Sequence, residues 1–160
     1  MLTQTVQWLD VKPSDRVLEL FAGLGNFTLP LAQRAREVVA VEGEAGLVQR
    51  AEANARRNGL QNIQHYTANL FEPSADAPWL AGDYDVCLLD PPRSGAREVL
   101  PFIASKKPRT IVYVSCHPGT LARDAEYLVH EAGYTLQAAG VMDMFPHTLH
   151  VESMAVFVRS

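Results

Sequence analysis

The sequence predicts an α/β fold, in which a doubly wound parallel β-sheet is covered by helices on both faces. Short β-branched runs alternate with longer helical stretches, which is the pattern of repeated right-handed βαβ units. Most of these runs are nearly continuous Val, Ile and Leu, as expected for strands buried on both sides. Strands are expected at Arg16–Leu20, Val38–Glu42, Ile63–Thr67, Tyr84–Asp90, Thr110–Ser115 and Met154–Arg159.

Helices are expected between these strands, at about residues 27–35, 44–58 and 118–132. The middle helix is rich in Ala, Arg and Glu and ends at Asn58-Gly59, a common helix stop. The last helix follows Pro118, and proline is tolerated at a helix start. Residues 73–78 and 95–108 are expected to be loop-rich connections. We see no repeat and no linker, so the chain is expected to be one domain.

Composition and charge narrow the class of protein. Of the 160 residues, 48% are hydrophobic and 20% are charged, as in an ordinary globular domain. The net charge of −4 excludes a small basic module that holds nucleic acid by electrostatics alone. Two cysteines cannot form a disulfide scaffold, and His147 and His150 complete no recognised zinc spacing with Cys116. No apolar run is long enough to span a membrane, and the first residues do not resemble a signal peptide. We therefore expect a soluble, cytoplasmic protein with no membrane contact and no metal site.

The carboxyl ends of the expected strands carry residues suited to ligand binding, because ligands of such sheets bind outside these ends. In Phe21–Asn26, Gly23 and Gly25 form a Gly-x-Gly turn that allows a ligand close to the backbone. Glu42 ends the next strand and can accept hydrogen bonds from a ribose diol, which suits NAD and S-adenosylmethionine equally. Thr28 replaces the third glycine of a dinucleotide fingerprint. A tight turn with a surface glutamate is the alternative interpretation.

The segment Asp90-Pro91-Pro92-Arg93 follows an apolar strand and is expected to be a stiff loop, since two prolines fix their φ angles. In methyltransferases that act on exocyclic amino groups, a similar Asp-Pro-Pro precedes an aromatic residue that stacks on the base. Arg93 stands at that position here, which argues against amine methylation. A proline-capped strand end is the alternative.

Cys116 lies between an expected strand and an expected helix, where the helix N-terminus favours a thiolate. This position indicates a nucleophile, whereas Cys87 inside an apolar strand is expected to be a small buried hydrophobic residue. His117 is either a base or a residue that points to solvent. Glu152 precedes the last strand beside apolar sequence, where a carboxylate acts as a general base or forms a surface salt bridge.

Together these motifs resemble the catalytic domain of RNA (uracil-5-)-methyltransferases, in particular the type that acts on 23S ribosomal RNA. The resemblance covers nearly the whole chain, and its most specific feature is a Ser-Cys-x-Pro loop combined with a terminal His-x-Glu. One departure is His117, because family members usually have asparagine after the cysteine. The matching segments are Leu20–Ala32, Asn58–Asn62, Leu89–Arg93, Ile111–Cys116 and Asp143–Thr148.

The resemblance implies a class I, Rossmann-like methyltransferase fold, with an antiparallel C-terminal strand in a mostly parallel sheet. It also implies methyl transfer from S-adenosylmethionine to C5 of a uridine in RNA through a covalent bond between the cysteine and C6. Cys116 is then the nucleophile, Glu152 removes the proton, and Pro91 and Arg93 bind the substrate. The cofactor contacts that the resemblance implies are Phe21, Asn26, Glu42, Asn69 and Asp90. Gly23 and Gly25 of the Gly-x-Gly turn are expected to bind the cofactor with them.

Family members also carry parts that these 160 residues lack, namely an N-terminal RNA-binding β-barrel and, in one branch, a cysteine-bound iron–sulfur cluster. We therefore expect residues 1–160 to be the methyltransferase catalytic domain of a longer enzyme, poorly active alone and without metal. Ribosomal RNA is expected to be the partner of the full-length enzyme. A non-catalytic cofactor- or RNA-binding remnant is the main alternative. An NAD-dependent dehydrogenase ranks third, because Thr28 and Cys116 disfavour it.

Overall fold

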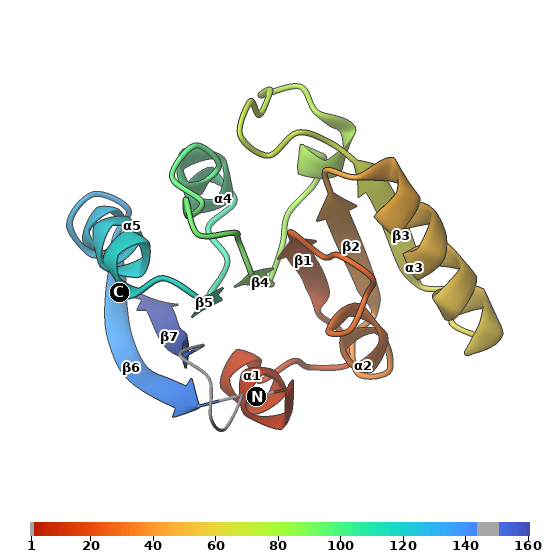
Figure 1. Cartoon of the computed structure of the whole chain (residues 1–160), viewed down its shortest axis with the longest axis horizontal. Coiled ribbons are helices and arrows are strands. Elements are labelled where there is room, and N and C mark those ends of the chain that lie inside the picture. The colour runs from red at the N-terminus through yellow and green to blue at the C-terminus, as the bar shows by residue number, and fades with distance from the viewer. Residues whose placement is uncertain (1, 144–150) are drawn as a thin grey trace.

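A computed structural model describes residues 2–143 and 151–160, and these form a seven-stranded sheet in the order β3-β2-β1-β4-β5-β7-β6 (Figure 1). The strands are β1 (Arg16–Leu20), β2 (Glu37–Glu42), β3 (Ile63–Thr67), β4 (Val86–Leu89), β5 (Thr110–Ser115), β6 (Tyr134–Asp143) and β7 (Val151–Arg159). The helices are α1 (Leu2–Leu9), α2 (Thr28–Ala32), α3 (Ala45–Arg57), α4 (Leu100–Ser105) and α5 (Pro118–His130), with a short 3-10 helix, η1, at Pro78–Leu80.

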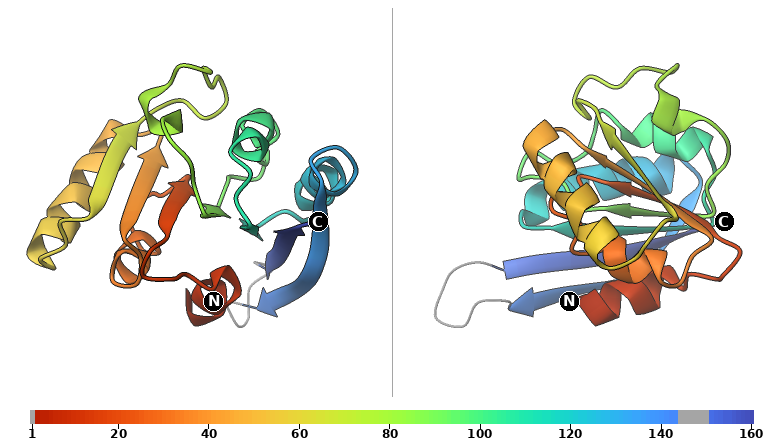
Figure 2. Two further views of the ribbon diagram at one scale, coloured as in Figure 1. Left: turned by 180° about the vertical axis from the view of Figure 1, so that it is seen from behind. Right: turned by 90° about the vertical axis from the view of Figure 1, so that its right-hand side faces the viewer.

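The pairing of the strands confirms the expected mostly parallel sheet. Strands β1 to β5 pair with one another in parallel. Strand β7 is antiparallel to β5 and to β6, so the expected antiparallel C-terminal strand is present. Figure 2 shows β6 and β7 side by side at one edge of the sheet.

Helices cover both faces of the sheet, as the continuous apolar strands predict. Figure 1 shows α4 and α5 on one side and α1 and α2 on the other. Successive strand residues contribute alternately to two buried cores: Leu18 and Leu89 pack with α4 and α5, whereas Val17 and Leu88 pack with α1 and α2. The strands are therefore held from both sides, and their carboxyl ends stay open for ligands.

Four elements were not predicted from the sequence: β6, α4, α1 and the short 3-10 helix η1. Strand β6 lies at the sheet edge with Leu136 and Val141 exposed, so its sequence is not the continuous apolar run of a central strand. Helix α4 lies inside the segment 95–108, which was expected to be loop, and its first turn contains Pro101. Helix α1 has only Thr5 and Leu9 fully buried, which is a weak periodic signal over eight residues. The other expected elements are confirmed to within a few residues, with β4 shorter than predicted.

Candidate active site

A cavity of about 570 Å³ lies where the strand order reverses, at the carboxyl ends of β1 to β4. Such a crevice is the usual ligand site of an open α/β sheet, and its size suits a small molecule or cofactor. Residues from all four strand ends contribute, and they combine carboxylates with aromatic and aliphatic side chains. The lining residues are Phe21, Glu42, Gly43, Glu44, Leu47, Asn69, Leu70, Phe71, Asp90, Pro91 and Pro92.

Glu42 joins the turn after β1 to the start of α3. Its Oε1 accepts a hydrogen bond from the Gly23 N–H at 3.2 Å, and its Oε2 accepts one from the Glu44 N–H at 2.9 Å. Gly23 and Gly25 have φ values of 58° and 91°, which glycine adopts without strain. The Gly-x-Gly turn is thus shaped by its glycines and held by Glu42.

The remaining residues predicted for this turn occupy different positions. Phe21 lines the cavity and has a φ of 63°, an uncommon conformation for a residue with a side chain. Gly23, Gly25 and Asn26 do not line the cavity, and Asn26 is exposed. The sequence therefore located the turn correctly. Of the four residues predicted there, Phe21 is the one that lines the cavity.

Asp90 follows β4, lines the cavity and interacts electrostatically with Glu152 of β7. Burial raises its pKa to about 7, and the negative charge of Glu152 acts in the same direction. Asp90 is thus close enough to Glu152 for the two charges to interact. Pro91, which is buried, and Pro92, which is exposed, follow as part of the cavity wall.

Cys116 and Glu152 lie at the same end of two paired strands, Cys116 directly after β5 and Glu152 near the start of β7. The antiparallel register of β5 and β7 pairs Ser115 with Ser153. The next position along each of the two strands is Cys116 on one side and Glu152 on the other, so these two residues are opposite each other in the register. Cys116 is exposed, whereas Cys87 is completely buried and burial raises its pKa. The structure confirms that the two cysteines occupy the contrasting environments that the sequence predicted.

His117 is half-buried at the start of α5. It is the N-cap of α5, and its Nδ1 accepts a hydrogen bond from the Thr120 N–H at 3.2 Å. Its backbone N–H donates to the Ser115 Oγ at 3.0 Å. Asparagine is among the best N-cap residues, so the imidazole performs a capping function that asparagine also provides. This capping contact is a structural role that the sequence did not predict for His117.

Some predicted residues lie outside the cavity or outside the described part of the chain. Arg93 is exposed and does not line the cavity, but its carbonyl accepts a hydrogen bond from the Thr120 Oγ1 at 3.0 Å. His147, His150 and the motif residues 144–148 lie outside the described residues. Within residues 2–143 and 151–160, no three acidic, histidine or cysteine side chains are grouped as a metal site. The helices of that part of the chain are all too short or too polar to cross a membrane.

Two known families match different parts of the chain. The family described as tRNA (Uracil-5-)-methyltransferase matches residues 81–160, the half that contains Asp90, Cys116 and Glu152. The chain belongs to this family. The description Ribosomal RNA adenine dimethylase matches residues 1–76, the half that contains the Gly-x-Gly turn and Glu42.

Curated relatives of this uracil-5-methyltransferase chain are closely similar over 99% of its length. The 23S rRNA (uracil(1939)-C(5))-methyltransferases RlmD of Xanthomonas axonopodis pv. citri and Alkalilimnicola ehrlichii are each 63% identical to it over 159 residues. The chain spans 36% of the length of each of these two relatives.

Solved methyltransferases share the fold. The Pyrococcus abyssi tRNA (uracil-54, C5)-methyltransferase, solved in complex with S-adenosyl-L-homocysteine, is similar with a TM-score of 0.80 and 29% identity. That similarity covers 98% of this chain and 37% of the Pyrococcus chain. A precorrin-6y C5,15-methyltransferase from Geobacter metallireducens also has a TM-score of 0.80, at 13% identity and over 99% of this chain and 87% of its own. The expected class I methyltransferase fold is confirmed.

Sequence reasoning missed a buried pair beneath the Gly-x-Gly turn of this methyltransferase domain. Glu19, in β1, is 1% exposed and accepts a hydrogen bond from the Thr28 hydroxyl. Burial raises the pKa of Glu19 to about 8, although the Thr28 hydrogen bond acts in the opposite direction. The available signal was an acidic residue inside an otherwise apolar strand. Thr28 is therefore the partner of a buried acid as well as the substitute for a third glycine.

The aromatic side chain of Phe71, which lines the same cavity as the predicted Phe21, was also missed. The rings of Phe21 and Phe71 lie 5.9 Å apart between centroids and are inclined by 54°. Phe71 remains 41% exposed, and its backbone N–H donates to the Asn69 Oδ1 at 2.9 Å. An exposed aromatic ring at a cavity mouth is suited to stacking on a planar ligand group.

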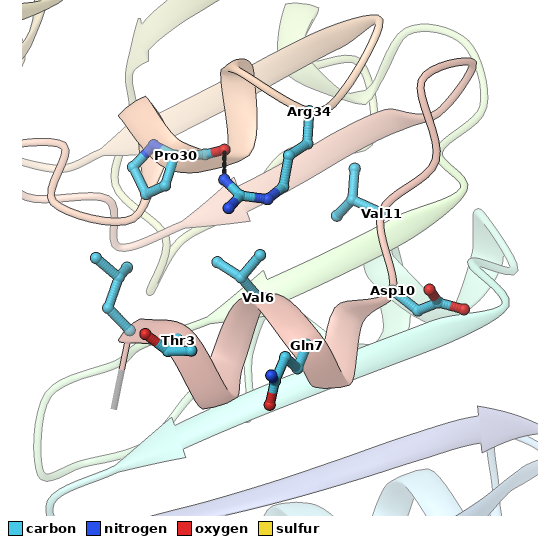
Figure 3. Close-up of a pocket in the computed structure, with 8 residues that line it drawn as sticks. Thr3, Val6, Gln7, Asp10, Val11, Pro30 and Arg34 are labelled. Atoms are coloured by element: carbon cyan, nitrogen blue, oxygen red, sulfur yellow. Dashed lines mark hydrogen bonds between the residues drawn. The ribbon is translucent and has the colours of Figure 1, made fainter.

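A second cavity, of about 480 Å³, lies between α1 and α2 (Figure 3). Its charged side chains are Asp10 and Arg34, and the Arg34 guanidinium donates to the Pro30 carbonyl at 2.8 Å. None of the residues predicted from the sequence for the site lines it. The groups suited to chemistry therefore belong to the cavity at the carboxyl ends of the strands.

Proposed function

We propose that this chain is the catalytic domain of an S-adenosylmethionine-dependent RNA (uracil-C5)-methyltransferase, with a uridine of 23S ribosomal RNA as substrate of the full-length enzyme. The observation that carries the proposal is that Asp90 lines the cavity and interacts electrostatically with Glu152. The register of β5 and β7 in turn brings Glu152 to the level of Cys116. The names of the relatives support the substrate, and we place the full-length enzyme in the cytoplasm as part of the same proposal.

The chemistry of the cavity fits S-adenosylmethionine better than NAD. Glu42, Glu44 and Asp90 provide negative charge that suits a ligand carrying a sulfonium and an ammonium group. The same charges disfavour the pyrophosphate of NAD. The aromatic and aliphatic lining suits adenine, and Glu42 has the acceptor oxygens for a ribose diol. The residues proposed to hold the cofactor are Phe21, Gly23, Gly25, Asn26, Glu42, Asn69 and Asp90.

The proposed reaction begins with Cys116, because C5 of uracil is a poor nucleophile. The Cys116 thiolate adds to C6, which moves electron density to C5 as an enolate. S-adenosylmethionine, when bound, supplies an electrophilic methyl group for C5. Glu152 then removes the proton from C5, and the electron pair released expels Cys116 from C6. The thiolate and the C5=C6 double bond are restored, and the proton resides on Glu152.

The proposed substrate must leave its stack before Cys116 can reach C6. Pro91 and Arg93 are proposed to contact the extruded nucleotide. The net charge of −4 indicates that this domain contributes little of the phosphate affinity, which we assign to other parts of a longer enzyme.

Calorimetric titration with S-adenosylhomocysteine, and separately with NAD, tests the proposal on this chain. We expect a measurable heat with S-adenosylhomocysteine and none with NAD. Binding of NAD alone would contradict the proposal and favour a dehydrogenase. Binding of S-adenosylhomocysteine by a full-length enzyme that never methylates RNA would favour a cofactor-binding remnant.

A further inference from the structure

Three side chains of α5 hold the segment that follows the Asp90-Pro91-Pro92 wall. The Thr120 hydroxyl donates to the Arg93 carbonyl at 3.0 Å, and the Arg123 Nη2 donates to the Ser94 carbonyl at 2.9 Å. The Asp124 Oδ2 accepts from the Ala96 N–H at 2.8 Å. Backbone groups of three of the four residues 93–96 are thus bound by side chains of one helix. We call Thr120, Arg123 and Asp124 the α5 clamp.

The clamp is a built and buried arrangement. Asp124 is 1% exposed, and its carboxylate also accepts hydrogen bonds from the Tyr113 hydroxyl at 2.5 Å and from Arg123 at 3.0 and 3.1 Å. Gly95 has a φ of 84°, and a Cβ there would lie 2.6 Å from the Arg123 Nη2 and 2.8 Å from the Asp124 Oδ2. The segment therefore approaches the Asp124–Arg123 pair as closely as glycine permits.

The clamp joins the two parts of the proposed active site. At one end, residues 93–96 continue directly from Pro91 and Pro92, which line the cavity. At the other end, α5 begins two residues after Cys116, with His117 as its N-cap. The three clamp residues thus connect the cofactor wall to the helix that follows the nucleophile.

We propose that Thr120, Arg123 and Asp124 are positioning residues that hold the Asp90–Pro92 wall in the conformation that binds cofactor, at a fixed place relative to Cys116. This inference rests on the proposed function. An intact clamp restricts local opening of the segment, so less of the cofactor's binding energy is used to order the wall. Loss of the clamp should therefore weaken cofactor binding without removing any group that touches the cofactor.

The chain provides a matched control for this test. Arg123 is 41% exposed in its side chain, pairs with buried Asp124 and also binds a backbone carbonyl. Arg109 is 42% exposed, pairs with Asp15, which is 5% exposed, and binds the Asp10 carbonyl. Arg123→Gln and Arg109→Gln should therefore lower the unfolding temperature similarly, but only the first substitution disturbs the segment 93–96.

Titration with S-adenosylhomocysteine and limited trypsin digestion read out the effect. We expect Arg123→Gln to weaken binding roughly 2- to 30-fold, the range for coupling through residues that do not touch the ligand. The affinity of Arg123→Lys should lie between those of Arg123→Gln and the unsubstituted chain. We also expect faster cleavage after Arg93, the first residue of the clamped segment, and after Arg97, which follows that segment. Arg109→Gln should match the unsubstituted chain in both measurements.

Equal affinity and equal cleavage rates for the two glutamine variants would overturn the inference. Failure of the unsubstituted chain to bind S-adenosylhomocysteine would instead remove the proposed function, and the positioning role with it. In that event, faster cleavage of Arg123→Gln would still support the clamp as a local restraint on residues 93–96.

Discussion

Replacing Glu42 by alanine should weaken the binding of S-adenosylhomocysteine by one to two orders of magnitude. Each carboxylate oxygen of Glu42 already accepts one backbone hydrogen bond, from Gly23 or Glu44, and retains acceptor capacity for a ribose hydroxyl. Hydrogen bonds to a charged group contribute about 1.5–3 kcal/mol, and each 1.4 kcal/mol corresponds to a factor of ten in Kd. Losing the diol contacts should therefore raise Kd by roughly 10- to 100-fold.

The glutamine variant makes the test sharper. Glu42→Gln places an NH₂ donor opposite one of two backbone donors, the Gly23 or the Glu44 N–H, so it should also disturb the turn. Isothermal titration calorimetry gives Kd for both variants, with denaturation curves to confirm folding. Glu37→Gln is the control, because Glu37 opens the same strand at its other end and pairs with Arg16. A Kd for Glu42→Ala within twofold of the unsubstituted chain would refute the assignment of Glu42 to the ribose.

Three further predictions concern charge and backbone conformation. Since the pKa of Asp90 is about 7, binding of S-adenosylmethionine should weaken up to about tenfold between pH 8 and pH 6, and Asp90→Asn should flatten this dependence. The pKa of Glu19 is raised from 4.5 to about 8, so the folded state binds a proton that the unfolded state has released. The free energy of unfolding should therefore fall as pH rises from about 5 to 8, and Glu19→Gln should remove a few kcal/mol of that fall. Gly25→Ala should cost about 1–2 kcal/mol of stability in urea denaturation, because Gly25 has a φ of 91°.

A specific result would contradict each of these three predictions. An affinity that is constant from pH 6 to pH 8 would contradict the role of Asp90, and S-adenosylhomocysteine, which lacks the sulfonium charge, serves as the control ligand. If the stability of Glu19→Gln depends on pH in the same way as that of the unsubstituted chain, the pKa of Glu19 is not raised in the folded state. A Gly25→Ala variant as stable as the unsubstituted chain would show that the turn relaxes at little cost.

The sequence predicted the sheet well because its central strands are buried on both faces. The continuous apolar runs gave the bounds of β1 and β5 correctly, and the mixed pattern of Ile63–Thr67 gave those of the edge strand β3. Residues at the carboxyl ends of β1, β2, β3 and β4 do line one cavity. The edge strand β6 carries no such run, and α4 is too short for a periodic pattern. Local pattern indicates an element only where burial imposes one residue type along it.

The functional contacts that were missed depend on distant parts of the chain. The closeness of Cys116 and Glu152 follows from the antiparallel insertion of β7 between β5 and β6, which no local motif encodes. The hydrogen bonds of Asp124 with Tyr113 and with the Ala96 N–H likewise join segments far apart in the sequence. The capping role of His117 was missed because its partner is a backbone N–H three residues later.

The central claim is that Cys116 opens the reaction at C6 and that Glu152 completes it at C5. The most direct measurement is a denaturing gel with labelled RNA and labelled S-adenosylmethionine, run on Cys116→Ala and Glu152→Gln variants of a full-length enzyme that carries this chain. We expect Cys116→Ala to leave the RNA free and unmethylated. Glu152→Gln should accumulate RNA that is covalently attached and already methylated, because the retained C5 proton prevents release of the thiolate. Normal turnover by Glu152→Gln without an adduct, or an adduct formed by Cys116→Ala, would contradict the account.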